Sequence, residues 1–283
     1  MSRFIIRNDS GQEWPLDGEK GVWFSNVQGL GIQNAQNTAD LGGGFALYMD
    51  TGYYPMVTVP GDIIIMPPDA YQTYRSFVNF LLSSEELTLL YQPFGTEVFY
   101  RRVKIEYINK GVTDKRGMLT CPMSVLPLTP WYSPRVATLT LQGQTEDAMT
   151  YDFEYSEGLT YGSDLAGSYA AEVTPAGHLP ASIRLTISDL LSNPVLTLTG
   201  SNSGIEFARC AVEDEVSGLD YSSLQRDSYI RDSSGSNLLD YVSMATDPYI
   251  RIPLGEPCIL RLQADGSISG AASVSIYSYY RSV

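Results

Sequence analysis

Turn signals punctuate this sequence so densely that they constrain its fold more than any other feature. The 283 residues include 25 glycines and 16 prolines, which bound short runs rich in Val, Ile, Thr, Tyr and Phe. Short apolar runs between Gly and Pro are typical of β-strands joined by turns. With 43% hydrophobic and 18% charged residues, the composition is that of a globular protein and not of a disordered one. The sequence therefore predicts a folded, mainly β protein.

One segment departs from the strand pattern and predicts a helix near residues 69–83. Asp69 follows two prolines in a position to cap a helix, and Gln72 completes a capping-box pattern. Apolar residues then recur at helical spacing: Tyr71, Tyr74, Phe77, Val78, Leu81 and Leu82. An isolated helix of this length is marginal in water, so we expect it to cover a sheet.

Strands are predicted in the first half over residues 87–92, 97–109 and 118–125. Pro122 favours an edge position for the last of these, because proline cannot donate a hydrogen bond to a neighbouring strand. The glycine-flanked stretch 42–66 is interpreted as an arm that becomes ordered on assembly, not as a packed strand.

The second half is predicted to consist of strands almost throughout. Apolar residues alternate with period two in 183–187, 258–262 and 274–276. About ten short strands without a blade-length repeat favour a sandwich or jelly roll over a propeller. The predicted strands are 136–142, 149–155, 183–187, 195–199, 205–212, 227–231, 238–243, 249–252, 258–263 and 272–280.

A proline-rich stretch and a step in charge mark a predicted domain boundary. Three prolines fall within residues 127–134, where a central strand cannot continue. Residues 1–134 carry a net charge of −3 and residues 135–283 carry −11, of the total of −14. We therefore predict one domain over 1–133 and a second over 134–283. The acidic second half is poorly suited to specific nucleic-acid binding or to an anionic membrane, because both repel negative charge.

Residues suited to catalysis or metal binding are scarce. His178 is the single histidine, so a catalytic triad would depend on one loop residue. The acidic run 213–215 with nearby Asp220 offers oxygen ligands for Ca²⁺, although a solvated acidic loop is the commoner structure for such a run. A carboxylate pair for glycoside hydrolysis stays open as an alternative, but nothing in the sequence singles one out. We predict a protein without catalysis, cofactor or metal.

The three cysteines, Cys121, Cys210 and Cys258, are predicted to be free and buried, which suits synthesis in a reducing cytoplasm. The first residues lack the apolar run of a signal peptide, and no run approaches the roughly 20 apolar residues of a membrane span. We therefore expect a soluble chain without an export signal.

Tyrosine clusters supply the remaining candidates for a site. The 20 tyrosines suit half-buried sheet faces, protein interfaces and sugar stacking alike, and sheet packing with subunit contact is the simplest interpretation. Pro130, Trp131 and Tyr132 are candidates for a domain junction or an assembly contact. Tyr221 and Tyr229, together with Trp131, are the candidates for stacking on a glycan.

Several motifs occur together in an order that resembles one protein family. In the first half these are Gly29-Leu30-Gly31, the Tyr/Phe helix at 71–82, Leu89-Leu90-Tyr91-Gln92-Pro93-Phe94-Gly95, Lys110-Gly111 and Thr129-Pro130-Trp131-Tyr132. In the second half they are Leu219-Asp220-Tyr221-Ser222-Ser223, Asp227-Ser228-Tyr229-Ile230, Ile250-Arg251-Ile252-Pro253 and Tyr279-Tyr280-Arg281-Ser282-Val283. Over its whole length the chain resembles the distal tail proteins of siphophages or prophages from Gram-positive bacteria.

The resemblance implies an N-terminal β-sandwich domain with one helix and a C-terminal galectin-like or jelly-roll β-sandwich. It further implies a homo-hexameric ring, built by residues 1–133, that joins the tail tube to the baseplate or tip. The implied partners are the tail tube protein, the tape-measure protein and tail-associated or baseplate proteins. The implied location is the virion tail tip, after synthesis in the cytoplasm of the bacterial host. The alternative is a carbohydrate-binding module for host-surface glycans that uses the C-terminal sandwich.

Overall fold

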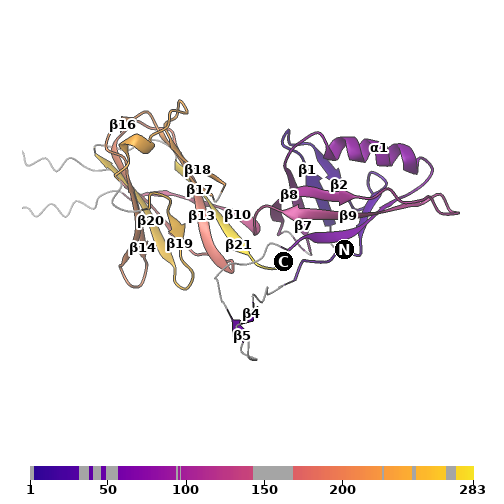
Figure 1. Ribbon diagram of the computed structural model, residues 1–283. Helices are drawn as coiled ribbons and strands as arrows, with labels where there is room; N and C mark the ends of the chain where they lie inside the picture. The colour runs from indigo at the N-terminus through magenta and orange to yellow at the C-terminus, as the bar shows by residue number, and fades with distance from the viewer. Residues whose placement is uncertain are drawn as a thin grey trace, which may run out of the picture. The chain divides into compact units, whose positions relative to one another are not determined.

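The computed structural model describes residues 3–31, 38–40, 46–48, 57–93, 95, 97–142, 168–224, 226–243, 247–265 and 272–283. The chain folds into two compact units (Figure 1): Met1–Ser133 with Tyr280–Val283, and Pro134–Tyr279. It passes between them within strand β10 (Trp131–Thr138) and again within β21 (Ala272–Tyr280). The last four residues, which the sequence analysis assigned to the second domain, therefore belong to the first unit.

The prediction of a mainly β protein is confirmed. In the first unit the strands pair antiparallel in the order β2-β1-β7-β8-β9-β6-β3, and β4 pairs with β5 in a separate hairpin. The long β8 links the two halves, because residues 99–103 pair with β7 and residues 103–108 pair with β9. The bounds are β1 Arg3–Arg7, β2 Glu13–Pro15, β3 Val22–Ser25, β4 Thr38–Asp40, β5 Ala46–Tyr48, β6 Val59–Ile65, β7 Leu87–Gln92, β8 Phe99–Ile108 and β9 Leu119–Pro127.

The predicted helix is α1 (Ala70–Leu81), the one α-helix in the ranges given above, and it covers the strands of the first unit (Figure 1). Its buried residues are Ala70, Phe77 and Leu81, and the Trp14 ring of β2 lies 5.4 Å from that of Phe77. The buried face is narrower than predicted, because Tyr71 at the start of the helix is 61% exposed. No helix in the described residues has the length and apolarity to span a bilayer.

The capping box predicted at the start of α1 does not form. The Asp69 side chain makes no capping hydrogen bond, and the Asp69 carbonyl oxygen accepts the N–H of Thr73 at 2.9 Å as the first bond of the helix. The helix is held by the burial of its apolar face rather than by its cap, which is the usual source of helix stability in a folded protein.

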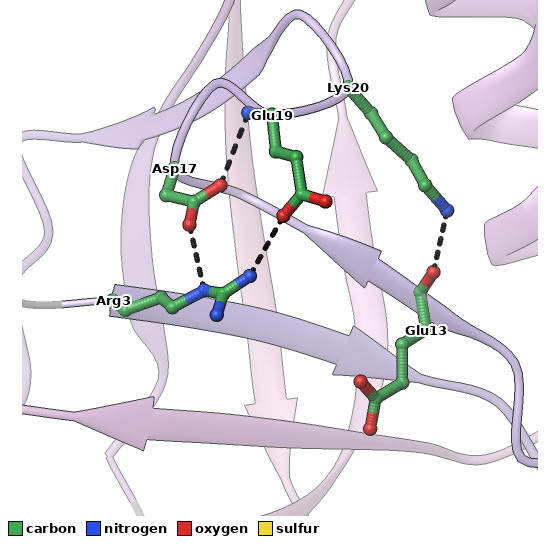
Figure 2. A network of polar contacts seen from close by, with 5 residues as sticks. All are labelled: Arg3, Glu13, Asp17, Glu19 and Lys20. Atoms are coloured by element: carbon green, nitrogen blue, oxygen red, sulfur yellow. Dashed lines mark hydrogen bonds and ion pairs between the residues drawn. The ribbon is translucent and has the colours of Figure 1, made fainter.

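A polar network orients the turn between β2 and β3 (Figure 2). The Arg3 guanidinium meets two carboxylates, with Nε 2.7 Å from Asp17 and Nη2 2.9 Å from Glu19. The Lys20 ammonium donates to the Glu13 carbonyl oxygen at 2.8 Å. Exposed ion pairs each contribute about 0–1 kcal/mol, so the network fixes the path of the turn more than it stabilises the unit.

The edge position predicted from Pro122 is wrong, since β9 lies between β6 and β8. Pro122 pairs with Asp62, and its carbonyl oxygen accepts the N–H of Asn109 at 2.8 Å. The nitrogen and the carbonyl of one residue in an antiparallel strand point to the same neighbour, so the Pro122 nitrogen also faces the β8 side. Pro122 lies opposite the end of β8 at Ile108. Its missing N–H therefore removes at most the last hydrogen bond between β8 and β9.

The interpretation of 42–66 as an arm is wrong for its last third. Residues 59–65 form β6, which lies between β3 and β9, and Val59, Ile63 and Ile65 are at 0% exposure. Residues 42–45 and 49–56 of the predicted arm lie outside the described residues.

The second unit is a sandwich of two antiparallel sheets. One has the order β18-β17-β13-β21 with β19 on β13, and the other has the order β11-β12-β20-β14-β15 with β16 on β14. A single hydrophobic core combines inward side chains of both sheets, as shown by Leu185 and Leu260, both at 0% exposure. The bounds are β11 Thr140–Gln142, β12 Ser168–Val173, β13 Leu179–Ile187, β14 Leu191–Gly200, β15 Glu206–Ala211, β16 Glu215–Val216, β17 Leu219–Leu224, β18 Asp227–Arg231, β19 Arg251–Ile252 and β20 Cys258–Asp265.

Most predicted strands of the second half are confirmed, with two exceptions. Residues 238–243 contain the 3-10 helix η1 (Leu239–Tyr241) instead of a strand. Leu238 and Val242, which flank η1 on its two sides, are both buried at 5% exposure. The predicted strand 149–155 lies outside the described residues.

Candidate functional site

Pro130, Trp131 and Tyr132 lie at the end of the first unit, directly before the passage into the second. Trp131 is 1% exposed and packs in the core, with its ring centroid 6.1 Å from that of Tyr91. Tyr132 pairs with Tyr100 of β8, and the two rings stack at 5.7 Å and 21°. The buried Trp131 and the half-buried Tyr132 therefore anchor β10 to the first unit, and the Trp131 ring is not available to stack on a sugar.

The C-terminal motif forms a second anchor in the first unit, which the sequence analysis did not identify. The Tyr280 ring meets Phe99 edge-on at 5.1 Å and 86°. Three residues later, the N–H of Val283 donates to the Leu30 carbonyl oxygen at 3.2 Å. Gly29, directly before Leu30, has a φ of +81. A Cβ at Gly29 would lie 2.4 Å from the Thr58 carbonyl oxygen, so the chain can pass this close to Thr58 only with glycine. Two motifs far apart in the sequence therefore belong to one local structure.

Lys110-Gly111 also has a structural explanation. A Cβ at Gly111 would lie 1.7 Å from the Thr120 carbonyl oxygen, so only glycine permits this approach to β9. The Lys110 ammonium lies 4.3 Å from the ring centroid of Tyr71 on α1. The motif therefore connects the loop after β8 with the start of the helix.

Tyr221 on β17 has a structural role, because its hydroxyl bonds to the backbone of the segment that leads into β19. Its side chain is 0% exposed, its hydroxyl donates to the Pro248 carbonyl oxygen at 2.9 Å, and it also accepts the N–H of Ile250. Burial raises the pKa of Tyr221 above the ordinary value of 10.0. No face of this ring is open to a sugar, so the glycan-stacking prediction rests on Tyr229 alone.

Tyr229 on β18 is partly exposed and lies beside two arginines. The guanidinium of Arg231 is 4.7 Å and that of Arg184 is 5.8 Å from its ring centroid. The Tyr229 hydroxyl donates to Asp220 at 3.3 Å, and Asp220 also lies 3.8 Å from Arg184. Burial, followed by the nearby Asp220 carboxylate, raises the pKa of Tyr229.

The structure does not bring together the acidic residues considered as candidate Ca²⁺ ligands. Glu215 belongs to β16 and pairs with β14, whereas Asp220 lies on β17 in the opposite sheet. Within the described ranges, no group of three or more His, Cys, Asp and Glu residues is placed to hold a metal ion. His178 is exposed in its loop, and its N–H donates to the Tyr279 carbonyl oxygen at 2.7 Å.

A polar pocket of about 340 Å³ lies beside α1 in the first unit. Its lining combines an indole, an amine, a carboxylate and hydroxyl or amide groups: Trp14, Lys20, Asp69, Gln72, Thr73 and Ser76. Such groups suit hydrogen bonds with a polar partner, and neither histidine nor cysteine is among them.

The first unit matches a known family. Residues 3–127 correspond to the family described as "Distal tail protein, N-terminal domain". Residues 3–127 belong to the distal tail protein family. This match confirms the predicted family for the first unit.

The distal tail protein fold extends over both units. A chain of the phage P2 baseplate, in its activated conformation with Ca, has a TM-score of 0.64 and 16% identity, and 100% of each chain is covered. The SPP1 Dit protein, described as a paradigm of the hub adsorption apparatus in phages that infect Gram-positive bacteria, has a TM-score of 0.61 and 12% identity, and the match covers 97% of this chain and 98% of that chain. At these identities the likeness establishes the fold. A search of the curated proteins finds no match for this sequence.

Proposed function

We propose that this distal tail protein is a ring-forming hub of a phage tail, without catalysis, that joins the tail tube to the baseplate or tip. One observation carries the proposal: residues 3–127 match the distal tail family, and the whole chain shares its fold with a baseplate chain over 100% of both lengths. A fold shared over both units fits a protein with the same place in a particle.

The first unit, residues 1–133, is proposed to build the ring as a homo-hexamer. Large apolar side chains on its surface support this role: Leu82 is 78% and Val112 is 91% exposed. In the described part of the chain, β2 pairs with one strand, β1, whereas β3 pairs with β6 on one side and has Asp17 bridged to Trp23 on the other. Exposed apolar residues and unpaired strand edges are stabilised when a second copy covers them.

The partners proposed for the ring are the tail tube protein, the tape-measure protein and tail-associated or baseplate proteins. The proposed location is the tail tip of the virion, after synthesis in the cytoplasm of a Gram-positive host. The total charge of −14 argues against nucleic acid as a specific partner. Two of the three stacking candidates of the carbohydrate-binding alternative, Trp131 and Tyr221, are buried, which leaves that alternative with Tyr229 alone.

Purified protein tests the hub proposal directly. Light scattering over a range of concentrations measures the mass in solution, and negative-stain images show the shape of the assembled species. We expect particles of six-fold symmetry, and antibody labelling at the tail tip of virions. A chain that stays monomeric at all concentrations, and that no antibody detects in virions, would contradict the proposal.

A further inference from the structure

Arg101 occupies a position on β8 where the strand otherwise carries core residues. Side chains alternate along a strand, so Phe99, Arg101 and Val103 share the inward face. Their exposed fractions are 8%, 6% and 0%. The neighbouring Lys104 points outward and is exposed. A guanidinium therefore lies where the fold of the first unit would accept an apolar side chain.

The described residues offer Arg101 an acceptor and an aromatic face but no opposite charge. Its Nε donates to the Thr129 carbonyl oxygen at 2.9 Å, and its Cζ lies 5.3 Å from the ring centroid of Trp131. Arg101 takes no part in the ion pairs that Arg3, Arg7 and Arg184 form within the described ranges, and burial alone accounts for its pKa shift. The indole Nε1 of Trp131 is also buried, and no acceptor among the described residues reaches it.

An uncompensated buried charge is costly. Burial lowers the pKa of Arg101 to about 10, so the group still carries its full charge at neutral pH. Arginine is almost never fully buried without a partner, because desolvation of a charge costs several kcal/mol. An apolar residue at this position would avoid that cost. The isolated chain therefore holds a guanidinium ready to bind an anion, with Trp131 as a rigid wall.

We propose that Arg101 is the receptor for a carboxylate from a second copy of this chain, and that the pair forms when the ring closes. This inference rests on the proposed ring. A guanidinium binds a carboxylate through two parallel hydrogen bonds, which adds geometric specificity to the contact. Residues 1–134, which include the proposed ring-building unit, carry 13 Asp and Glu against 10 Lys and Arg, so a neighbouring copy has carboxylates to present at this contact.

Three variants of the full chain test the proposal: Arg101→Met, Arg101→Lys and, as a control, Lys104→Met. Methionine removes the charge at Arg101 while filling similar space, and Lys104→Met makes the same change in charge on the exposed side of the same strand. Ring formation is followed by light scattering and negative stain against concentration, and the melting temperature of each monomer is measured under dilute conditions.

We expect Arg101→Met to raise the concentration needed for half-maximal ring formation by at least roughly 30-fold. Arg101→Lys keeps the charge without the two-bond geometry and should give an intermediate loss, whereas Lys104→Met should form rings as the wild type does. The Arg101→Met monomer should melt within roughly 3 °C of the wild type, because losing the desolvated charge and losing the hydrogen bond to Thr129 act in opposite directions.

The outcomes separate this inference from the ring itself. Absence of rings from the wild type contradicts the proposed function. If wild-type and Arg101→Met rings form at the same concentration, the ring stands, and a carboxylate from a second copy at Arg101 is ruled out.

Discussion

Replacing Tyr221 by phenylalanine removes one oxygen atom that satisfies two backbone groups, one buried at Ile250 and one partly buried at Pro248. The hydroxyl donates to the Pro248 carbonyl oxygen at 2.9 Å and accepts the N–H of Ile250, and the ring itself is 0% exposed. Phenylalanine keeps the ring volume, so no cavity adds to the effect. A buried donor or acceptor left without a partner costs about 1–3 kcal/mol. We expect Tyr221→Phe to lower the free energy of unfolding by about 2–4 kcal/mol and the melting temperature by roughly 6–12 °C.

Tyr229→Phe is the matched control, because it removes the same atom from the adjacent strand of the same sheet. Its hydroxyl makes one bond of 3.3 Å to Asp220 at a partly exposed position, so the cost should stay below about 0.5 kcal/mol. Urea unfolding followed by circular dichroism measures both variants, and hydrogen exchange of the Ile250 amide locates the change. Equal destabilisation by the two variants, or an unchanged exchange rate at Ile250, would refute the role given to Tyr221.

Three further changes test the anchors of the fold. Gly29→Ala should destabilise the first unit by about 2–4 kcal/mol in urea unfolding, because φ is +81 and the new Cβ would lie 2.4 Å from the Thr58 carbonyl oxygen. Gly31→Ala, with open space around it, should cost less than about 0.5 kcal/mol, and similar costs for the two would count against the close approach. Tyr280→Ala should cost about 1–2 kcal/mol through loss of its edge-on aromatic contact, and an unchanged urea midpoint would contradict that anchor. Burial raises the pKa of Tyr221, so the stability contributed by its neutral phenol is complete below pH 10.0 and is lost as pH rises further. Tyr221→Phe should therefore lose stability less steeply than the wild type in alkaline titration. Parallel curves for the two proteins would contradict this linkage.

Predictions that depend on local pattern agree best with the structure. The strands predicted at 87–92, 227–231 and 272–280 have the bounds of β7, β18 and β21. Alternating apolar residues define such strands without knowledge of their neighbours. β17 was not predicted, because Ser222 and Ser223 interrupt its alternation. The Ser223 hydroxyl accepts the N–H of Ile183 at 2.9 Å, a contact that no local pattern shows.

The candidate site was harder to predict than the fold. The sequence singles out Trp131 for its place at the junction and as a candidate for sugar stacking. Its burial supports the first role and excludes the second. Arg101 carries one local signal, a charged residue between Phe99 and Val103 in an inward register. This signal is ambiguous, because an arginine at the rim of a sheet commonly reaches solvent through its long side chain.

The sequence by itself determined the class of the fold, the place of the helix and the absence of a pattern typical of an active site. Turns and alternation follow from the preferences of neighbouring residues, which a single sequence displays in full. Only the tertiary structure decided that β9 is a central strand, that the Tyr221 side chain is buried and that Arg101 lies on the inward face of the first unit. The hydrogen-bond partners of Tyr221 and Arg101 lie 27 and 28 residues away in the sequence, at Pro248 and Thr129. Contacts over such separations are set by how the sheets pair and pack, and local preference carries no information about them.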